Sequence, residues 1–356
     1  MVQYAREPKA KDMTSDKKAV FFGELMMRLA TKRYERLVQA HELEVDYTGA
    51  EANVGISLVN YGLQAYVVSA VPDSPVGQAC VNAMRRYGLN VDYVQRMGYR
   101  LGIYFVETGA AQRPSLFLYN RKGSAITELD RGDVAWDEIM QGKDWFHFTG
   151  ITPALADSVT DLTRDACAAA KRHGLTVSCD LNYRSKLWPL EKAQRVMTEL
   201  MQYVDVLFTN EEEASQVLGV SARDTDISAG KLSDEGYEDV ARQLLERFSL
   251  RYAVITLRES LSATVNNWSG MFFDGKQVYR SRKYHIDHIV DRIGGGDAFT
   301  GGFIFGILTG MDPQDTVEFA AAASCLKHTI HRDFNLVTLE EVKALMKGGG
   351  GGRIQR

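Results

Sequence analysis

Cysteine is scarce in this sequence of 356 residues, and long apolar runs are missing from it. The four cysteines stand far apart and form no Cys-x-x-Cys pair, which argues against a disulfide framework and against a zinc site. No run of about 18 apolar residues occurs, and the first 18 residues lack the apolar segment of a secretory signal. We therefore expect a cytoplasmic protein.

An excess of one charge sign is also missing. Lysine and arginine number 42 against 46 aspartate and glutamate, which gives a net charge of −4, and the basic residues are scattered. Binding to nucleic acid or to an anionic membrane normally requires a concentrated positive surface. We expect neither partner, and we expect a small-molecule ligand instead.

Short apolar runs alternate with helical patterns along most of the chain. A buried strand is predicted over 19–29, a helix over 50–61 and a second strand over 65–71. Further short apolar runs, separated by helical patterns, lie at 144–149, 175–180, 204–209 and 252–257. This alternation is typical of βαβ units with a parallel sheet, so we predict an α/β fold.

One segment departs from this alternation. The runs 102–107 and 115–119 are separated by Gly109 and Pro114, which predicts a β-hairpin. The polar stretch between Gly219 and Tyr237 predicts a surface loop rather than a linker between domains. We expect a single domain over 19–347, with a polar tail at 1–18 and a glycine-rich tail at 348–356.

Three consecutive glycines, Gly294, Gly295 and Gly296, precede Asp297 at the predicted start of a late helix. Glycines allow backbone N–H groups to converge at a helix N-terminus, where the helix dipole favours an anion such as a phosphate. The helix dipole should also lower the pKa of Asp297. Taken alone, a Gly-Gly-Gly-Asp sequence is more often a plain turn followed by an N-cap.

The residues around this turn resemble the signature Asp-Thr-x-Gly-Ala-Gly-Asp-Ala-Phe of the ribokinase-like (PfkB-type) carbohydrate kinases. Arg292 and Gly295 replace the usual Thr and Ala. The segment from Thr48 to Gly55 resembles the family's Gly-Gly-Ala-x-x-Asn-x-Ala, with Thr48 in place of the first glycine. The resemblance covers 20–346. It implies a three-layer αβα sandwich with a mostly parallel central sheet, and a small β-sheet lid from about 28–48 and 94–121.

The resemblance also implies an ATP-dependent kinase that uses Mg²⁺, and it implies roles for individual residues. Asp297 would be the catalytic base, and the glycine turn would be the anion hole. The sugar would be contacted by Gly49, Asn53, Tyr104, Tyr119, Arg121 and Arg184. Asn210 and Glu213 would hold the metal through its waters. The nucleotide would be contacted by Thr256, Arg258, Gly294 and Gly296.

Within the family, three segments resemble the branch that phosphorylates 2-keto-3-deoxygluconate: 119–125, 150–155, and 180–184 followed by 187–188. A sugar acid is an anion, and arginines such as Arg121 and Arg184 pair well with a carboxylate. A neutral-sugar kinase, such as a fructokinase or ribokinase, and a catalytically silent binding protein remain alternatives. We also expect a homo-oligomer formed through the lid.

Overall fold

The computed structural model describes residues 16–223 and 233–348. The predicted tails therefore lie outside the described residues, except for 16–18 and Gly348, and so does part of the predicted loop between Gly219 and Tyr237. Within the described ranges, no helix combines the length and apolar character needed to cross a membrane.

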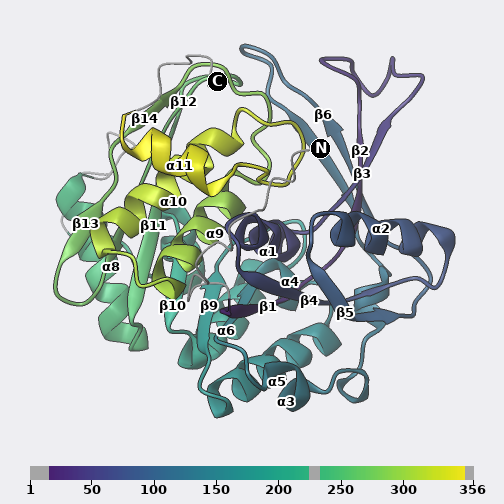
Figure 1. The fold of residues 1–356 in the computed structure, drawn as a ribbon, viewed down its shortest axis with the longest axis horizontal. Coiled ribbons are helices and arrows are strands. Elements are labelled where there is room, and N and C mark those ends of the chain that lie inside the picture. Colours follow the sequence, from purple (N-terminus) through teal and green to yellow (C-terminus); the bar gives the residue numbers. More distant parts are fainter. Residues whose placement is uncertain (1–15, 224–232, 349–356) are drawn as a thin grey trace, which may run out of the picture.

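A ten-stranded sheet forms the centre of the molecule (Figure 1). Its order is β13-β12-β11-β10-β9-β8-β1-β4-β5, and β14 pairs with β12. Pairing is parallel from β11 to β5, whereas β12, β13 and β14 add antiparallel strands at one edge. The strands are β1 (Lys18–Phe22), β4 (Gln64–Val71), β5 (Asn90–Arg96), β8 (Trp145–Thr149), β9 (Thr176–Asp180), β10 (Val206–Thr209), β11 (Tyr252–Ser260), β12 (Asn266–Phe273), β13 (Val278–Arg280) and β14 (Tyr284–Ile286).

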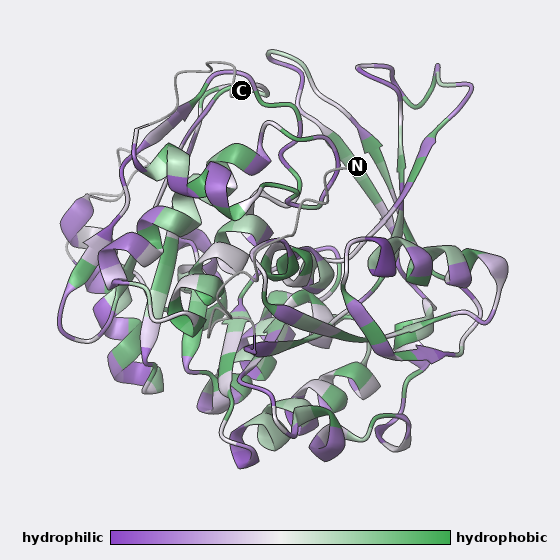
Figure 2. Cartoon of the chain, in the orientation of Figure 1, coloured by the Kyte–Doolittle hydropathy of each residue, from purple (hydrophilic) through white to green (hydrophobic). Residues whose placement is uncertain are grey.

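Helices cover both faces of this sheet because its central strands are apolar on both sides. In β1, Val20 and Phe22 belong to one hydrophobic core, and Ala19 and Phe21 belong to the other. The first core is closed by α3 (Trp136–Met140), α4 (Ile151–Ala154), α5 (Asp157–Arg172), α6 (Leu190–Leu200), α7 (Glu211–Leu218) and α8 (Asp234–Phe248). The second is closed by α1 (Ala50–Asn60), α2 (Pro75–Arg86), α9 (Gly295–Leu308), α10 (Pro313–Lys327) and α11 (Leu339–Met346). Hydrophilic residues face outward on helices such as α8 (Figure 2).

A second sheet of four strands extends beyond the main sheet (Figure 1). Its order is β3-β2-β6-β7, from β2 (Met26–Ala30), β3 (Glu44–Thr48), β6 (Gly102–Glu107) and β7 (Leu116–Asn120). Strands β6 and β7 pair antiparallel, which confirms the predicted hairpin. The predicted fold class, a mostly parallel α/β sandwich with a small β-sheet lid, is confirmed. We call this second sheet the lid.

Two sequence-based boundaries were wrong. The apolar run 19–29 is not one strand, because it divides at Gly23 into β1 of the main sheet and β2 of the lid. Gly23 donates its amide to Val68 O at 3.2 Å, and a Cβ on Gly23 would lie 1.9 Å from the Glu51 carboxylate. In addition, Val94 to Arg96 pair with β4 in the main sheet, so the lid part of 94–121 begins at Gly102.

Candidate active site

Several of the predicted site residues lie where α9 begins and where β9 and β10 of the main sheet end. Asp180 is the last residue of β9, and Asn210 follows the end of β10. Asp297 lies in the first turn of α9, and its charge adds to the rise in the pKa of Asp180 that burial and Glu213 produce. Loops at the carboxyl ends of parallel strands are the usual place for a ligand in such a sheet.

The glycine turn that precedes α9 is shaped by its neighbours. Gly294 has φ 79° in the left-handed region, and a Cβ there would lie 2.0 Å from Asp333 O. Gly295 packs against the His328 ring, where a Cβ would lie 2.6 Å from Cε1. Gly296 is exposed, and a Cβ there would have no described atom within 4 Å. The backbone can therefore be approached closely at Gly296.

The amides of this turn are partly used. The Ala298 amide donates to Gly294 O at 2.8 Å, and the Gly295 amide donates to Arg292 O at 3.3 Å. The amides of Gly296 and Asp297 belong to the first turn, where a helix offers no acceptor of its own. These two amides, with the positive end of the α9 dipole, can bind an anion.

Asp297 is held by Asn53, whose Nδ2 donates to Asp297 Oδ2 at 2.7 Å. The pKa of Asp297 is raised to about 7, chiefly by burial. The hydrogen bond from Asn53 and the charge of Arg184 oppose this shift, and the charges of Asp333 and Glu51 add to it. The expected lowering by the helix dipole was wrong, because burial outweighs it. A carboxyl group with this pKa can accept a proton at neutral pH.

Gly49 and Thr48 hold Asn53 from the other side. The main-chain amide of Asn53 donates to Gly49 O at 2.7 Å. A Cβ on Gly49 would lie 2.4 Å from Glu24 O. The Thr48 hydroxyl lies 2.8 Å from Asn53 Oδ1 and 2.8 Å from Asp333 Oδ2. The threonine that departs from the family motif therefore forms a side-chain link that a glycine could not make.

Three predicted sugar-binding residues adjoin one another on and just after the lid strands. The rings of Tyr104 and Tyr119 stack with centroids 5.4 Å apart, and the Arg121 guanidinium lies 4.8 Å from the Tyr119 centroid. Arg121 Nη1 also lies 3.4 Å from Oε2 of the buried Glu24. Burial raises the pKa of Glu24, and the charge of Arg121 opposes this rise. The Tyr104 hydroxyl donates to Asp333 Oδ2 at 2.5 Å.

Arg184 lies apart from this group, on the side of Asp297 and Asp180. Its Nη1 donates to Tyr183 O at 3.0 Å and lies 3.9 Å from Glu213 Oε1. Its charge opposes the rise in the pKa of both Asp180 and Asp297. The two arginines that were predicted to bind one carboxylate thus approach the site from different elements.

Asn210 and Glu213 occupy the start of α7. The Glu213 amide donates to Asn210 Oδ1 at 2.9 Å, so Asn210 is the helix N-cap, and Glu213 Oε1 accepts the Tyr183 amide at 3.1 Å. Burial, and then the charges of Glu213 and Asp297, raise the pKa of Asp180 well above its ordinary value. No three His, Cys, Asp or Glu side chains in the described ranges surround one point as metal ligands. These mutually repelling acids fit a hydrated magnesium ion held through its waters.

Thr256 and Arg258 are two of the residues that the resemblance assigned to the nucleotide. They lie inside β11, opposite Gly270 and Trp268 of β12, because Glu259 and Ser260 continue the antiparallel pairing. Arg258 is exposed. The pKa of Arg292 is lowered chiefly by its own burial and then by the charge of Arg258. Arg292 itself donates Nε to Ala263 O at 2.9 Å in the loop after β11. The Arg292 guanidinium, two residues before Gly294, is thus held by the loop after β11.

Sequence reasoning missed three buried carboxylates, Glu24, Glu51 and Asp333, and the partly exposed Asp180. Glu51 Oε1 accepts the Thr149 hydroxyl at 2.7 Å, the Thr149 amide at 3.0 Å and the Thr152 hydroxyl at 2.7 Å. The position of Glu51 within the segment 48–55 was a usable signal, because a charged residue on an apolar helix face needs partners.

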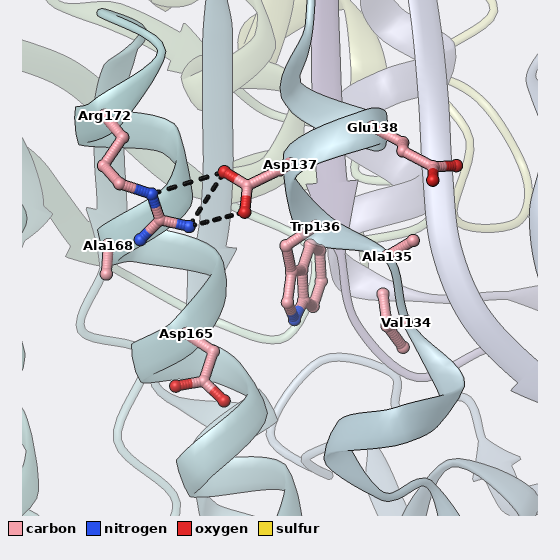
Figure 3. Close-up of a pocket in the computed structure, with 8 residues that line it drawn as sticks. All are labelled: Val134, Ala135, Trp136, Asp137, Glu138, Asp165, Ala168 and Arg172. Atoms are coloured by element: carbon pink, nitrogen blue, oxygen red, sulfur yellow. Dashed lines mark hydrogen bonds and ion pairs between the residues drawn. The ribbon is translucent and has the colours of Figure 1, made fainter.

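A surface hollow of about 380 Å³ between α3 and α5 contains none of these residues (Figure 3). It is lined by Trp136 and by Asp137, which accepts Nη2 of Arg172 at 2.8 Å. These helices close the core on the sheet face opposite α9. The hollow is therefore not part of the candidate site.

Comparison with known proteins bears on this site. The family model "pfkB family carbohydrate kinase" matches residues 16–332. A crystal structure of 2-dehydro-3-deoxygluconokinase from Thermotoga maritima shares 47% sequence identity, with TM-score 0.90, over 93% of this chain and 98% of its own. Curated relatives include a 2-dehydro-3-deoxygalactonokinase from Haloferax volcanii, 32% identical over 94% of this chain and 98% of its own. A 2-dehydro-3-deoxygluconokinase from Thermoproteus tenax is 30% identical over 92% of this chain and 94% of its own.

Proposed function

Because the chain belongs to the pfkB family of carbohydrate kinases, we propose that it transfers the terminal phosphate of ATP to 2-keto-3-deoxygluconate, also called 2-dehydro-3-deoxygluconate. The product would be the 6-phosphate. The observation that carries the proposal is the position of Asp297 beside the amides of the first turn of α9. Asp297 has a pKa of about 7, and the backbone can be approached closely at Gly296. The substrate follows from the similarity to the Thermotoga maritima enzyme.

The reaction assigns each group a step. The terminal hydroxyl of the sugar acid would lie beside Asp297, which accepts its proton as the oxygen attacks the terminal phosphorus of ATP. The bond from that phosphorus to the bridging oxygen breaks, and ADP leaves. The amides of Gly296 and Asp297 would stabilise the charge on the transferred group, and Arg258 and Arg292 would bind the other phosphates.

Asp180, Asn210 and Glu213 would hold a magnesium ion through its waters. The ion would neutralise phosphate charge during transfer. The Asn210 cap and the Tyr183 amide hold Glu213 in place.

A second candidate substrate is 2-keto-3-deoxygalactonate, because the Haloferax volcanii relative carries that name. Both acids present a carboxylate to Arg121 or Arg184, so the arginines do not distinguish them. A neutral-sugar kinase would leave these charges without a partner on the substrate. A silent binding protein would not need Asp297 beside an accessible anion site.

The direct test is product analysis. Purified protein with Mg-ATP and 2-keto-3-deoxygluconate should give one ADP for each phosphate ester, and phosphorus NMR should place the ester on the terminal carbon. Equal turnover of fructose or ribose would overturn the sugar-acid proposal. Sugar-dependent thermal stabilisation without ADP release would instead indicate a binding protein.

The pH dependence of the enzyme should follow Asp297. Its pKa in the folded protein is raised to about 7, and only the ionised form can accept the hydroxyl proton. We therefore expect kcat/KM to fall about tenfold per pH unit below pH 7 and to level off above pH 8. Measurement from pH 5 to pH 9 with excess magnesium checks this, and a flat profile down to pH 5 would contradict it.

Replacement of Arg121 separates its two contacts. Arg121→Met should raise KM for the sugar acid about 10- to 100-fold, because a charged hydrogen bond is lost, and should leave KM for ATP unchanged. It should also lower stability, because Glu24 loses its cation. The double variant Glu24→Gln/Arg121→Met should recover stability but not KM. Recovery of both would show that Arg121 has only a structural role.

The lid offers a surface for a second copy of the chain. Its edge strands β3 and β7 expose Val45, Leu116, Leu118 and Tyr119 at 40–51%. Edge strands of this kind can pair between subunits. We propose that these edges pair in a homo-oligomer. We also propose that the protein is cytoplasmic, because its four cysteines are unpaired and its family consists of kinases that use ATP.

A further inference from the structure

A buried lysine, to which the proposed reaction gives no role, packs against the glycine turn. Lys327 is the last residue of α10 and is 0% exposed, although a lysine side chain normally reaches water. Its Cε lies 3.3 Å from the position that a Cβ on Gly294 would take. The turn is therefore closed by this lysine at Gly294, whereas it can be approached at Gly296.

The ammonium group of Lys327 has few partners. Its Nζ donates to Ile330 O at 3.2 Å, and within residues 16–223 and 233–348 it forms no salt bridge. An ammonium group has three hydrogens to donate, and a buried charge without partners is costly. Methionine would fill a similar space without this cost, so packing alone does not account for a lysine here.

Three carboxylates near the turn act on this lysine. Burial lowers the pKa of Lys327, whereas the charges of Asp291, Asp333 and Asp297 oppose that change. Arg28, a second cation near these acids, is bound to two of them: Nη2 lies 2.7 Å from Asp291 Oδ2, and Nη1 lies 2.6 Å from Asp333 Oδ1. Lys327 forms no such bond, so its charge remains available to an anion that binds at the turn.

The end of α10 is fixed to the turn by neighbouring residues. The ring of His328 packs on Gly295, and Ser324 Oγ donates to Gly295 O at 2.7 Å. His328 O accepts the amide of Val290 at 2.8 Å. The pKa of His328 is lowered to about 4, chiefly by burial, so this ring is neutral at pH 7. The positive charge that this helix end brings to the turn is therefore that of Lys327.

We propose that Lys327 is a positioning residue whose fixed positive charge prepares the glycine turn for the transferred phosphate and favours the ionised form of Asp297. The inference rests on the proposed kinase function. A phosphate at the amides of Gly296 and Asp297 adds negative charge beside Asp291 and Asp333, and like charges repel strongly where water is excluded. A cation held by the protein offsets this repulsion without reorganising during the reaction.

The titration of Asp297 is a readout that a packing role would not change. The attraction between two charges is mutual, so loss of the Lys327 charge should raise the pKa of Asp297 above its value of about 7. We expect Asp297 to titrate about one pH unit higher, and the acidic limb of the kcat/KM profile to move with it. The other groups that act on Asp297 or respond to it stay in place: Asp333, Glu51 and Asp180 as acids, Arg184 as a base and Asn53 as a neutral donor.

The test compares Lys327→Met, Lys327→Gln and Lys143→Met with the parent protein. Lys327→Met keeps the length of the side chain without its charge. Lys327→Gln also keeps a donor for Ile330 O, which covers a failure of the methionine variant to fold. Lys143 is the matched control, because burial also lowers the pKa of this half-buried lysine, but it precedes β8 and so lies at the amino ends of the strands.

Both Lys327 variants should lower kcat/KM at pH 7 about 10- to 100-fold, with part of the loss recovered above pH 8, and Lys143→Met should match the parent protein. Carbon NMR of protein labelled at its aspartate carboxyl groups follows Asp297 without substrate, and Asp297→Asn identifies its signal. An unchanged titration of Asp297 in the folded Lys327 variants would overturn the proposal, even if kcat were low, because the lysine would then have only a packing role. If the parent protein phosphorylates no sugar acid, the proposed function fails, and this titration still decides the role of Lys327.

Discussion

Replacement of Asp297 by asparagine should lower kcat by about 100- to 10,000-fold, the usual contribution of a general base. The variant keeps an oxygen that can accept the Asn53 hydrogen bond, but it cannot accept the hydroxyl proton. KM for the sugar and for ATP should change little, because the binding contacts are kept. Steady-state kinetics with both substrates varied would measure this.

Stability provides the control for that variant. The pKa of Asp297 is raised from 3.8 to about 7 in the folded protein, so the fold binds a proton that the unfolded chain releases. Stability from this group is therefore lost as pH rises from about 4 to 7, and an asparagine avoids the loss. The midpoint of thermal unfolding of Asp297→Asn at pH 8 should equal or exceed that of the parent protein. Near-parental kcat in a folded variant would show that another group is the base.

Replacement of Gly294 by alanine should abolish most activity and also destabilise the protein. The φ of 79° is unfavourable for alanine by about 1–3 kcal/mol, and the added Cβ would meet Asp333 O at 2.0 Å. The turn must move, and the amides of Gly296 and Asp297 move with it. We expect kcat/KM to fall at least about 100-fold, and chemical denaturation to show the loss of stability.

Gly296→Ala is the matched control, because a Cβ there meets no described atom within 4 Å and the residue is helical. Alanine favours a helix over glycine by about 1 kcal/mol, so stability should be kept or increased. KM for ATP should nevertheless rise, because the methyl group enters the space from which phosphate approaches. Unchanged KM would place the phosphate elsewhere along α9.

Local sequence patterns were sufficient for much of this architecture. The apolar runs before Asp180 and Asn210 and the hairpin containing Tyr104 predicted strands that the structure contains. The glycine turn was predicted at the N-terminus of a helix, where α9 begins at Gly295. Each of these features depends on residues that are neighbours in sequence.

The remainder depends on contacts between distant segments. Arg28 and Asp333 are 305 positions apart, and Tyr104 and Asp333 are 229 apart, so no local pattern could join them. The division of 19–29 at Gly23 likewise involves a distant residue, because the Glu51 carboxylate fills the space that a Cβ on Gly23 would need. The raised pKa of Asp297 results from burial, which the position at a helix start does not reveal.

The measurement that tests the central claim most directly is ADP release from Mg-ATP with 2-keto-3-deoxygluconate, compared with 2-keto-3-deoxygalactonate, gluconate, fructose and ribose. We predict that the two keto acids are turned over with far higher kcat/KM than the neutral sugars, with 2-keto-3-deoxygluconate preferred, and that Asp297→Asn removes this turnover. Preferred turnover of a neutral sugar, or ADP release that Asp297→Asn does not affect, would contradict the account.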